Sequence, residues 1–240
     1  MIIDTDTNCK SKTDFMVKRG IEVVGRYYSS GSSSKNVTKE EAQALSRVGI
    51  KLFVVYEDGG DASSFPLTEQ QGFSDASHAV TQAQGIGQPQ GGTIYFAVEG
   101  LPDGYKSSDL SKIRQYFAGV NRGLGARYRS GVYGDGIVCK TLIEEGICSH
   151  TWLAQASFSF EGTQAFYAAK KWSLAQILTD LPKKQWRGPS VDLNEGLGDI
   201  GSFTVPISPL EIPTRRRSHS NKDAWPARGP ILAGYRELPG

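Results

Sequence analysis

The sequence predicts an α/β fold: a (β/α)8 TIM-type barrel, somewhat irregular in its last units, with a Pro-rich C-terminal tail. Eight short runs of β-branched and aromatic residues recur over roughly the first 200 residues. Helix-like segments separate most of them, and several runs are continuously apolar, as expected for strands buried on both faces. The chain of 240 residues suits a barrel at the small end of its range. A doubly wound open sheet is the alternative.

The predicted strands follow one another at short intervals along the chain. They are Ile2–Asp4, Glu22–Arg26, Lys51–Tyr56, Thr93–Val98, Gly131–Tyr133, Thr151–Gln155, Trp172–Gln176 and Ser190–Leu193. Helices are predicted over 38–48, 68–84, 107–128, 136–145 and 163–171. Thr38, followed by Glu40 and Glu41, has the pattern of a helix cap. Little helix signal separates the last two strands, so irregularity is expected there.

The composition changes after Phe203, which divides the chain into a barrel over 1–203 and a Pro/Arg-rich tail or linker over 204–240. Six of the 11 prolines follow Phe203, around the run Arg215–Arg217. Prolines at this density interrupt regular structure. The tail is either an extended linker or an arm that docks on the barrel or on another protein.

The charge distribution argues against nucleic-acid binding. The net charge is +2, but residues 1–203 hold 21 basic and 22 acidic residues, so the excess lies in the tail. A near-neutral body offers no electrostatic footprint for nucleic acid. No apolar run approaches the ~20 residues that span a bilayer. No signal peptide is visible before Ile2, and the localisation is left open.

Acidic side chains close several predicted strands, where barrel enzymes place their catalytic groups. These acids are Asp4, Asp6, Glu57, Glu99 and Asp192. Two carboxyl groups at one mouth are what glycoside hydrolysis uses, one as a general acid and one as a carboxylate. Glu99 follows the most apolar strand, where desolvation raises the pKa of a carboxyl group, so it is the predicted acid. Asp4 or Asp192 is its predicted partner, and helix capping is the alternative role for each.

Aromatic and amide side chains near the same strand ends are candidates for binding a sugar. Aromatic rings stack on the apolar face of a sugar, and polar groups bind its hydroxyls. The aromatic candidates are Tyr27, Tyr28, Tyr56, Tyr133 and Trp152, with packing in the core as the alternative. The polar candidates are Arg26, Gln155, Gln176 and Asn194, together with Asp6 and Glu57.

No cofactor or metal is predicted. Gly196–Gly201 matches a dinucleotide-binding fingerprint, but a Pro-rich segment follows it instead of the helix that a phosphate needs. The chain has no His/Cys cluster. The alternative is a hard cation held by the oxygen ligands of Asp4, Asp6 and Glu57.

Several motifs resemble, in order, a bacterial glycoside-hydrolase-like domain of unknown function. The family consists of TIM-barrel relatives of the family 25 lysozymes, which cleave the peptidoglycan glycan strand. The motifs are Ile3–Thr5, Ile94–Glu99, Gly131–Gly134, Trp152–Gln155, Trp172–Gln176 and Val191–Asn194. The resemblance implies that Glu99 is the general acid and that Asp4 and Asp192 are the acids of the first and last strands.

One position departs from the lysozyme pattern. Those enzymes have Asp-x-Glu on the fourth strand, whereas this chain has Ala97 two residues before Glu99. The resemblance implies a glycoside hydrolase acting on peptidoglycan or a related cell-wall glycan, at the envelope or outside the cell. The alternatives are a catalytically silent glycan-binding barrel and a structural component of a phage or secretion system.

Overall fold

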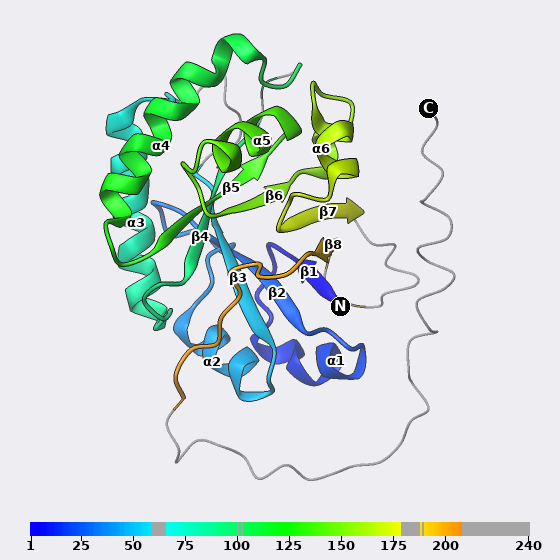
Figure 1. The fold of residues 1–240 in the computed structure, drawn as a ribbon. Coiled ribbons are helices and arrows are strands. Elements are labelled where there is room, and N and C mark those ends of the chain that lie inside the picture. The colour runs from blue at the N-terminus through cyan, green and yellow to red at the C-terminus, as the bar shows by residue number, and fades with distance from the viewer. Residues whose placement is uncertain (59–65, 100, 102, 179–187, 189, 208–240) are drawn as a thin grey trace.

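Eight strands pair in sequence order and close into a barrel in the computed structural model (Figure 1). The structure describes residues 1–58, 66–99, 101, 103–178, 188 and 190–207. The strands are β1 (Ile2–Asp4), β2 (Val23–Tyr28), β3 (Lys51–Tyr56), β4 (Thr93–Val98), β5 (Arg129–Gly134), β6 (His150–Leu153), β7 (Leu174–Leu178) and β8 (Asp192–Gly196). The closed barrel is therefore confirmed, and the open sheet is wrong.

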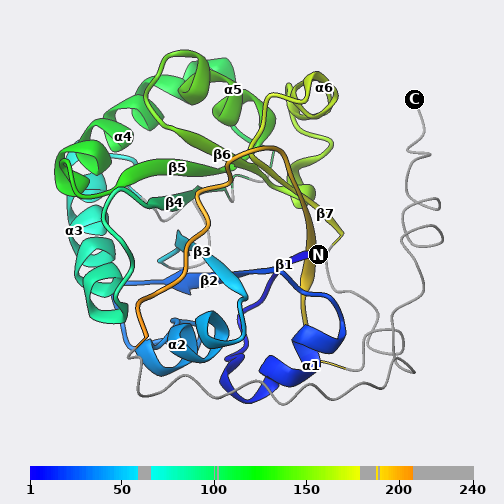
Figure 2. The same ribbon diagram turned by 60° about the horizontal axis from the view of Figure 1, so that its bottom comes forward.

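Helices cover the outside of the barrel, one after each of the first six strands (Figure 2). They are α1 (Thr13–Lys18), α2 (Lys39–Arg47), α3 (Glu69–Ile86), α4 (Leu110–Leu124), α5 (Gly136–Glu144) and α6 (Thr163–Ala169). The predicted cap is confirmed, because the Thr38 hydroxyl accepts a hydrogen bond from the Glu41 amide at 3.2 Å. The sequence did not predict α1, whose single buried residue, Met16, gives no helical period.

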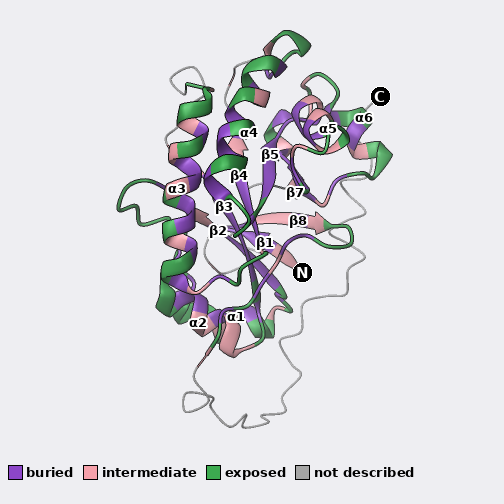
Figure 3. Ribbon diagram, turned by 60° about the vertical axis from the view of Figure 1, so that its left-hand side comes forward, coloured by how far each residue is buried: buried purple, intermediate pink, exposed green. Residues whose placement is uncertain are grey.

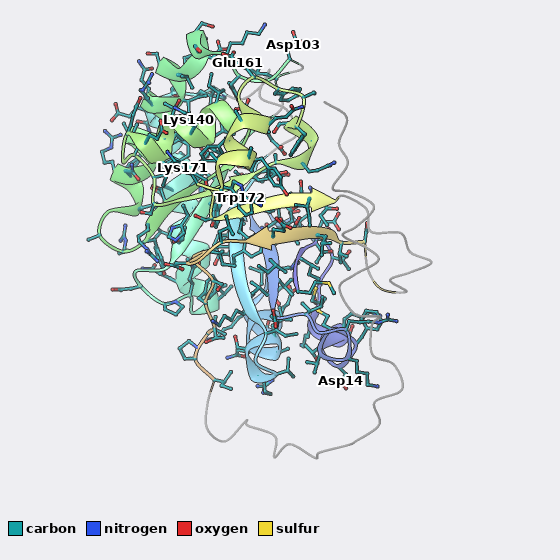
Figure 4. The ribbon with its side chains drawn as sticks, turned by 45° about the vertical axis from the view of Figure 1, so that its right-hand side comes forward. Asp14, Asp103, Lys140, Glu161, Lys171 and Trp172 are labelled. Carbon is teal, nitrogen blue, oxygen red and sulfur yellow. The ribbon has the colours of Figure 1, made fainter. Side chains whose placement is uncertain are left out.

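The last strand runs against its neighbours, which corrects the prediction of a (β/α)8 arrangement. β8 is antiparallel to both β1 and β7. Figure 4 shows the arrows of β7 and β8 pointing in opposite directions. Antiparallel neighbours do not need the helical crossover that parallel strands require, in agreement with the weak helix signal before β8.

Side chains of each strand alternate between the barrel interior and the layer beneath the helices. On β2, Val23 and Tyr27 belong to the interior cluster, with Phe53, Tyr95 and Trp152 from other strands. Val24 and Tyr28, which alternate with them on β2, pack beneath the helices. Most strand residues are consequently buried, whereas the outer helix faces are exposed (Figure 3).

Residues 197–207 cross the end of the barrel opposite the carboxyl ends of β1–β7 (Figure 2). The Tyr95 hydroxyl donates to the Ile200 carbonyl at 3.0 Å, and Phe203 pairs with Leu52. The Val205 amide donates to the Ser46 hydroxyl at 2.9 Å. This segment therefore closes one end of the barrel, while residues 208–240 of the predicted tail lie outside the described residues. Nowhere in the described ranges is a helix both long and apolar enough to cross a membrane.

Candidate active site

Two aspartates meet where the first and last strands close the barrel. Asp4 ends β1, Asp192 begins β8, and the two are direct partners in the antiparallel register. The pairing of the first and last strands therefore makes the two acids neighbours. Asp192 was expected near the end of the last strand; because β8 is antiparallel, its first residue lies beside the carboxyl end of β1.

Asp4 is almost completely enclosed, with 1% of its surface exposed. Its Oδ1 atom accepts hydrogen bonds from Asn194 Nδ2 at 2.7 Å and from Gln176 Nε2 at 3.4 Å. Burial raises its pKa to about 7; nearby Asp192 also raises it, while the two amide hydrogen bonds lower it. Asp4 is therefore an aspartate that can hold a proton near neutral pH.

Gln176 connects Asp4 to Asp192 and to Tyr133 through hydrogen bonds. Its Nε2 atom also donates to Asp192 Oδ2 at 3.0 Å, and its Oε1 atom accepts from the Tyr133 hydroxyl at 3.2 Å. A bulge in β7 follows Gln176, since the register with β8 shifts between Gln176 and Leu178. Bulges of this kind re-aim side chains beside functional sites.

Glu99 follows β4 and is half-buried. Burial and the nearby negative charge of Glu57 raise its pKa to about 7, while a hydrogen bond with Tyr133 lowers it. Gln176 joins the Tyr133 hydroxyl to both aspartates through hydrogen bonds, and Tyr133 lies within the electrostatic reach of Glu99. The three acids that the sequence singled out thus belong to one cluster of carboxyl, amide and phenol groups.

Tyr27 lies within the electrostatic reach of every acid of this cluster. Its pKa is raised by burial first, and then by the charges of Asp4, Glu57, Asp192 and Glu99. The ring is half-buried, and Lys35 Nζ lies 5.3 Å from its centroid.

Lys35 is a residue of this rim that sequence reasoning missed. It also lies 3.6 Å from a carboxylate oxygen of Glu57. A lysine that ends a serine-rich loop carries no signal for this role, because only the folded loop brings it over Tyr27.

Trp152 fills the barrel interior instead of offering a face to a sugar, which corrects its predicted role. It is 1% exposed, and its ring lies 4.3 Å from Tyr133 and 5.0 Å from Phe53 between centroids. Its Nε1 atom donates to Asn194 Oδ1 at 2.8 Å. Trp152 therefore orients Asn194, and Asn194 in turn donates a hydrogen bond to Asp4.

Three predicted sugar-binding residues face the helices instead of the interior, so their assignment is corrected. Arg26 is fully buried, and its Nε atom lies 2.8 Å from Glu41 of α2. Tyr28 is also fully buried and donates to Gln88 at 2.8 Å. Tyr56 is 2% exposed in the layer beneath the helices.

The remaining candidates lie around the rim. Asp6 is exposed and accepts a hydrogen bond from Thr7. Gln155 is half-buried in a short 3-10 helix after β6. Ala97 belongs to the interior face, opposite Tyr133 in the pairing of β4 with β5.

The described residues include no group of three or more His, Cys, Asp or Glu side chains arranged to hold a metal ion. The alternative cation site at Asp4, Asp6 and Glu57 has no such arrangement in these ranges. Lys140 and Lys171, labelled in Figure 4, lie on the outside of the molecule, where both contact Glu144.

Comparison with known proteins identifies the family of this chain. The model of the protein family described as Rv2525c-like, glycoside hydrolase-like domain matches residues 14–196. The chain belongs to this family. Among curated relatives, YbfG of Bacillus subtilis is 32% identical over an alignment of 180 residues, and the match covers 69% of this chain and 24% of YbfG. The chain therefore spans about a quarter of that relative's length.

Solved structures share the fold of this family member. The Tat-secreted protein Rv2525c of Mycobacterium tuberculosis, in complex with L-tartrate, has a TM-score of 0.68 and 22% identity. The match covers 84% of this chain and 97% of Rv2525c. The autolysin LytC of Streptococcus pneumoniae, in complex with a synthetic peptidoglycan ligand, has a TM-score of 0.50 and 14% identity, covering 80% and 45% of the two chains.

Proposed function

We propose that this domain cleaves a glycosidic bond of peptidoglycan or a related cell-wall glycan, with Glu99 as general acid. The observation that carries the proposal is that Glu99, Asp4 and Asp192 gather around Tyr133 and Gln176, with Gln176 hydrogen-bonded to both aspartates and to Tyr133. Burial raises the pKa of Glu99 and of Asp4 to about 7. Glycoside hydrolysis needs one carboxyl group that keeps its proton and one that is ionised.

The surroundings of the two groups support different roles. Glu99 and the nearby ring of Tyr27 are half-buried, whereas Asp4 is 1% exposed, so Glu99 is the group that a substrate oxygen can reach. Asp4 is enclosed, so burial keeps it protonated below about pH 7, and its two amide hydrogen bonds favour the carboxylate form above that pH. Glu99 then protonates the leaving oxygen, and Asp4 with Asp192 stabilises the positive charge that develops on the sugar.

The substrate class rests on the neighbours of the family. LytC was solved with a synthetic peptidoglycan ligand, and Rv2525c is a Tat-secreted protein. We therefore assign a cell-wall glycan as the substrate of this domain and the envelope or extracellular space as its place of action. Tyr27 supplies an aromatic face for a sugar ring at the rim.

The test is digestion of purified peptidoglycan by the wild-type protein and by Glu99→Gln, measured as new reducing ends. The wild type is expected to release them, and Glu99→Gln is expected to lose activity by about 100-fold or more, since general acid catalysis contributes about 10²–10⁴-fold. Glu40→Gln, an equal charge change at an exposed position of α2, is the control. Equal rates for wild type and Glu99→Gln would overturn the role of Glu99.

Ala97 favours a second candidate, a barrel that binds the glycan without cleaving it. A methyl group stands on the interior face of β4 where the resembling lysozymes have an aspartate. Co-sedimentation with peptidoglycan separates the two candidates. Binding by the wild type without any release of reducing ends supports the second, and cleavage supports the first.

A further inference from the structure

The serine-rich loop after β2 is held in place at both of its ends. Asn36 pairs with Tyr27 in a β-bridge, and its Oδ1 atom accepts a hydrogen bond from the Ser29 hydroxyl at 2.9 Å. From α3, Gln82 Oε1 accepts from the Ser29 amide at 3.1 Å, and Gln82 Nε2 donates to the Ser29 carbonyl. Because both ends of the loop are fixed, the backbone of Lys35 has a defined position at the rim of the barrel.

The ammonium group of Lys35 covers one face of the Tyr27 ring. Its Nζ atom lies 5.3 Å from the ring centroid and 3.6 Å from a carboxylate oxygen of Glu57. The side chains of Lys35 and Glu57 are 49% and 26% exposed, so solvent reaches both charges. An ion pair with this exposure contributes little to stability, because water screens it. Lys35 can therefore exchange Glu57 for another carboxylate with little change in free energy.

This position of Lys35 distinguishes neutral sugars from acidic ones. A sugar that stacks on the same face of Tyr27 must move the ammonium group off the ring, which removes the cation–π contact. A neutral sugar supplies no charge to replace that contact. A sugar that bears a carboxylate supplies a new ionic partner beside the ring, and Lys35 also offsets the repulsion between that carboxylate and Glu57. Such a difference between the free energies of binding two ligands is what sets specificity.

We propose that Lys35 is a specificity-determining residue that selects a sugar with a free carboxylate at the rim, beside Tyr27. This inference rests on the proposed function for the glycan site itself. In the peptidoglycan strand the carboxylate is that of the lactyl group of muramic acid, which is free only where the stem peptide is absent. A reaction that hydrolyses the amide bond to the peptide then supplies the preferred strand. A uronic acid carries the same charged group on its ring.

The test is the binding of four soluble tetrasaccharides, measured by calorimetry in a Glu99→Gln background so that cleavage does not interfere. The first pair is the peptide-free tetrasaccharide of the peptidoglycan strand, with its carboxylates free or converted to methylamides. The second pair is a hyaluronan tetrasaccharide, which contains a uronic acid, in the same two forms. With Lys35 present, the carboxylate form of one pair is expected to bind about three- to fivefold more tightly, the size of an exposed ion pair. Equal affinities within both pairs, or no binding of any of the four, would overturn the proposal.

Substitutions of Lys35 separate its charge from its packing. Lys35→Met is expected to weaken binding of the carboxylate form and to leave the methylamide form unchanged. Lys35→Arg is expected to keep the preference, and Glu57→Gln to increase it, because the competing carboxylate is gone. Lys112→Met, at an exposed position of α4, is the control. Equal weakening of both forms by Lys35→Met would assign Lys35 a packing role and contradict the proposal.

The two pairs also distinguish the two sources of the carboxylate. A preference that depends on Lys35 in the first pair assigns the lactyl group, and one in the second pair assigns a uronic acid. These binding measurements need no turnover. If the preference is found and the wild type does not cleave peptidoglycan, the proposed cleavage fails while the role of Lys35 stands. If peptidoglycan is cleaved and neither pair shows the preference, the role of Lys35 fails alone.

Discussion

Asp4 and Asp192 lie directly opposite each other in an antiparallel strand pair, and the amide nitrogen of Gln176 contacts both carboxyl groups. Their proximity is a product of barrel closure, because the two residues stand at opposite ends of the domain's sequence. The reversed direction of β8 makes Asp192 the first residue of its strand, beside the carboxyl end of β1. The candidate site therefore exists only when the barrel is closed.

The burial of Asp4 predicts that Asp4→Asn stabilises the protein at neutral pH. The pKa of Asp4 is raised from 3.8 to about 7 by burial. Between these values the unfolded chain ionises while the folded protein keeps its proton, so the free energy of unfolding falls as pH rises. Asparagine removes this loss. The gain over wild type should be absent near pH 4 and reach a few kcal/mol by pH 7 to 8, since each pKa unit is worth about 1.4 kcal/mol.

Urea unfolding of both proteins from pH 4 to pH 8 measures this difference. Asp14→Asn is the matched control, because Asp14 is exposed on α1, as Figure 4 shows. A difference between Asp4→Asn and wild type that stays constant with pH would rule out a buried, proton-holding Asp4.

The buried ion pair between Arg26 and Glu41 predicts a structural role for a residue that the sequence assigned to sugar binding. Glu41 also accepts from the Cys9 amide at 2.7 Å, and Arg26 donates to the Thr5 carbonyl, so the pair holds the segment after Asp4. Arg26→Met leaves Glu41 buried without its partner and should cost about 3–5 kcal/mol of stability. Thermal or urea unfolding measures the loss.

The control is Arg114→Met, which breaks an exposed pair with Glu145 and should change the unfolding midpoint little. The double variant Arg26→Met/Glu41→Leu should recover part of the loss, because no buried charge is left unpaired. If Arg26→Met folds with wild-type stability and binds glycan weakly, the sequence-based assignment was right after all.

Arg26 also shows why the sequence could predict the barrel but only part of the site. Arg26, Tyr27 and Tyr28 end the same strand, and alternation sends only Tyr27 to the interior. In a barrel strand both faces are buried, so hydropathy does not distinguish them. The strand-end rule therefore found Asp4 and Glu99, but it could not separate side chains that face the mouth from those that face the helices.

The direction of β8 was beyond the sequence for a related reason. The short apolar run around Asp192 predicts a strand but not whether that strand is parallel or antiparallel to its neighbours. The sequence therefore does not show which of Asp192 and Asn194 lies nearer the mouth of the barrel. Only the pairing with β1 shows that Asp192 lies at the mouth and that Asn194 lies deeper, opposite Ile2. The roles of Asn194 and Trp152 as supports of Asp4 followed from that register.

Two aromatic residues of the interior should respond differently to truncation. Trp152 is packed against Phe53, Tyr95 and Tyr133, so Trp152→Ala should cost about 3–5 kcal/mol of stability. Tyr27 is only half-buried at the rim, so Tyr27→Ala should leave the protein folded and weaken peptidoglycan binding by about tenfold, which corresponds to about 1.4 kcal/mol.

Co-sedimentation with peptidoglycan and thermal unfolding, applied to both variants, measure the two effects. Tyr167→Ala, on α6 outside the barrel, is a further aromatic truncation with no expected effect on glycan binding. Wild-type glycan binding by Tyr27→Ala would remove Tyr27 from the site.

The closed end of the barrel should respond to acid in the opposite sense from the mouth. His150 lies there with 4% of its surface exposed; its Nδ1 atom is 3.1 Å from the Thr93 hydroxyl, and its Nε2 atom is 3.4 Å from Asp199. Burial lowers the pKa of His150 below 6.5, although Asp199 partly offsets the effect. Below pH 6.5 the unfolded chain thus binds a proton at His150 that the folded protein does not bind, and the free energy of unfolding falls as pH decreases.

His150→Gln removes this loss, so its stability relative to wild type should rise as pH is lowered from 7 to 5, whereas that of Asp4→Asn should rise as pH is raised over the same range. Urea unfolding of both variants in one buffer series measures the two slopes, with His78→Gln on the exposed face of α3 as the control. Slopes of the same sign for the two variants would show that burial does not govern the titration at one of the two ends.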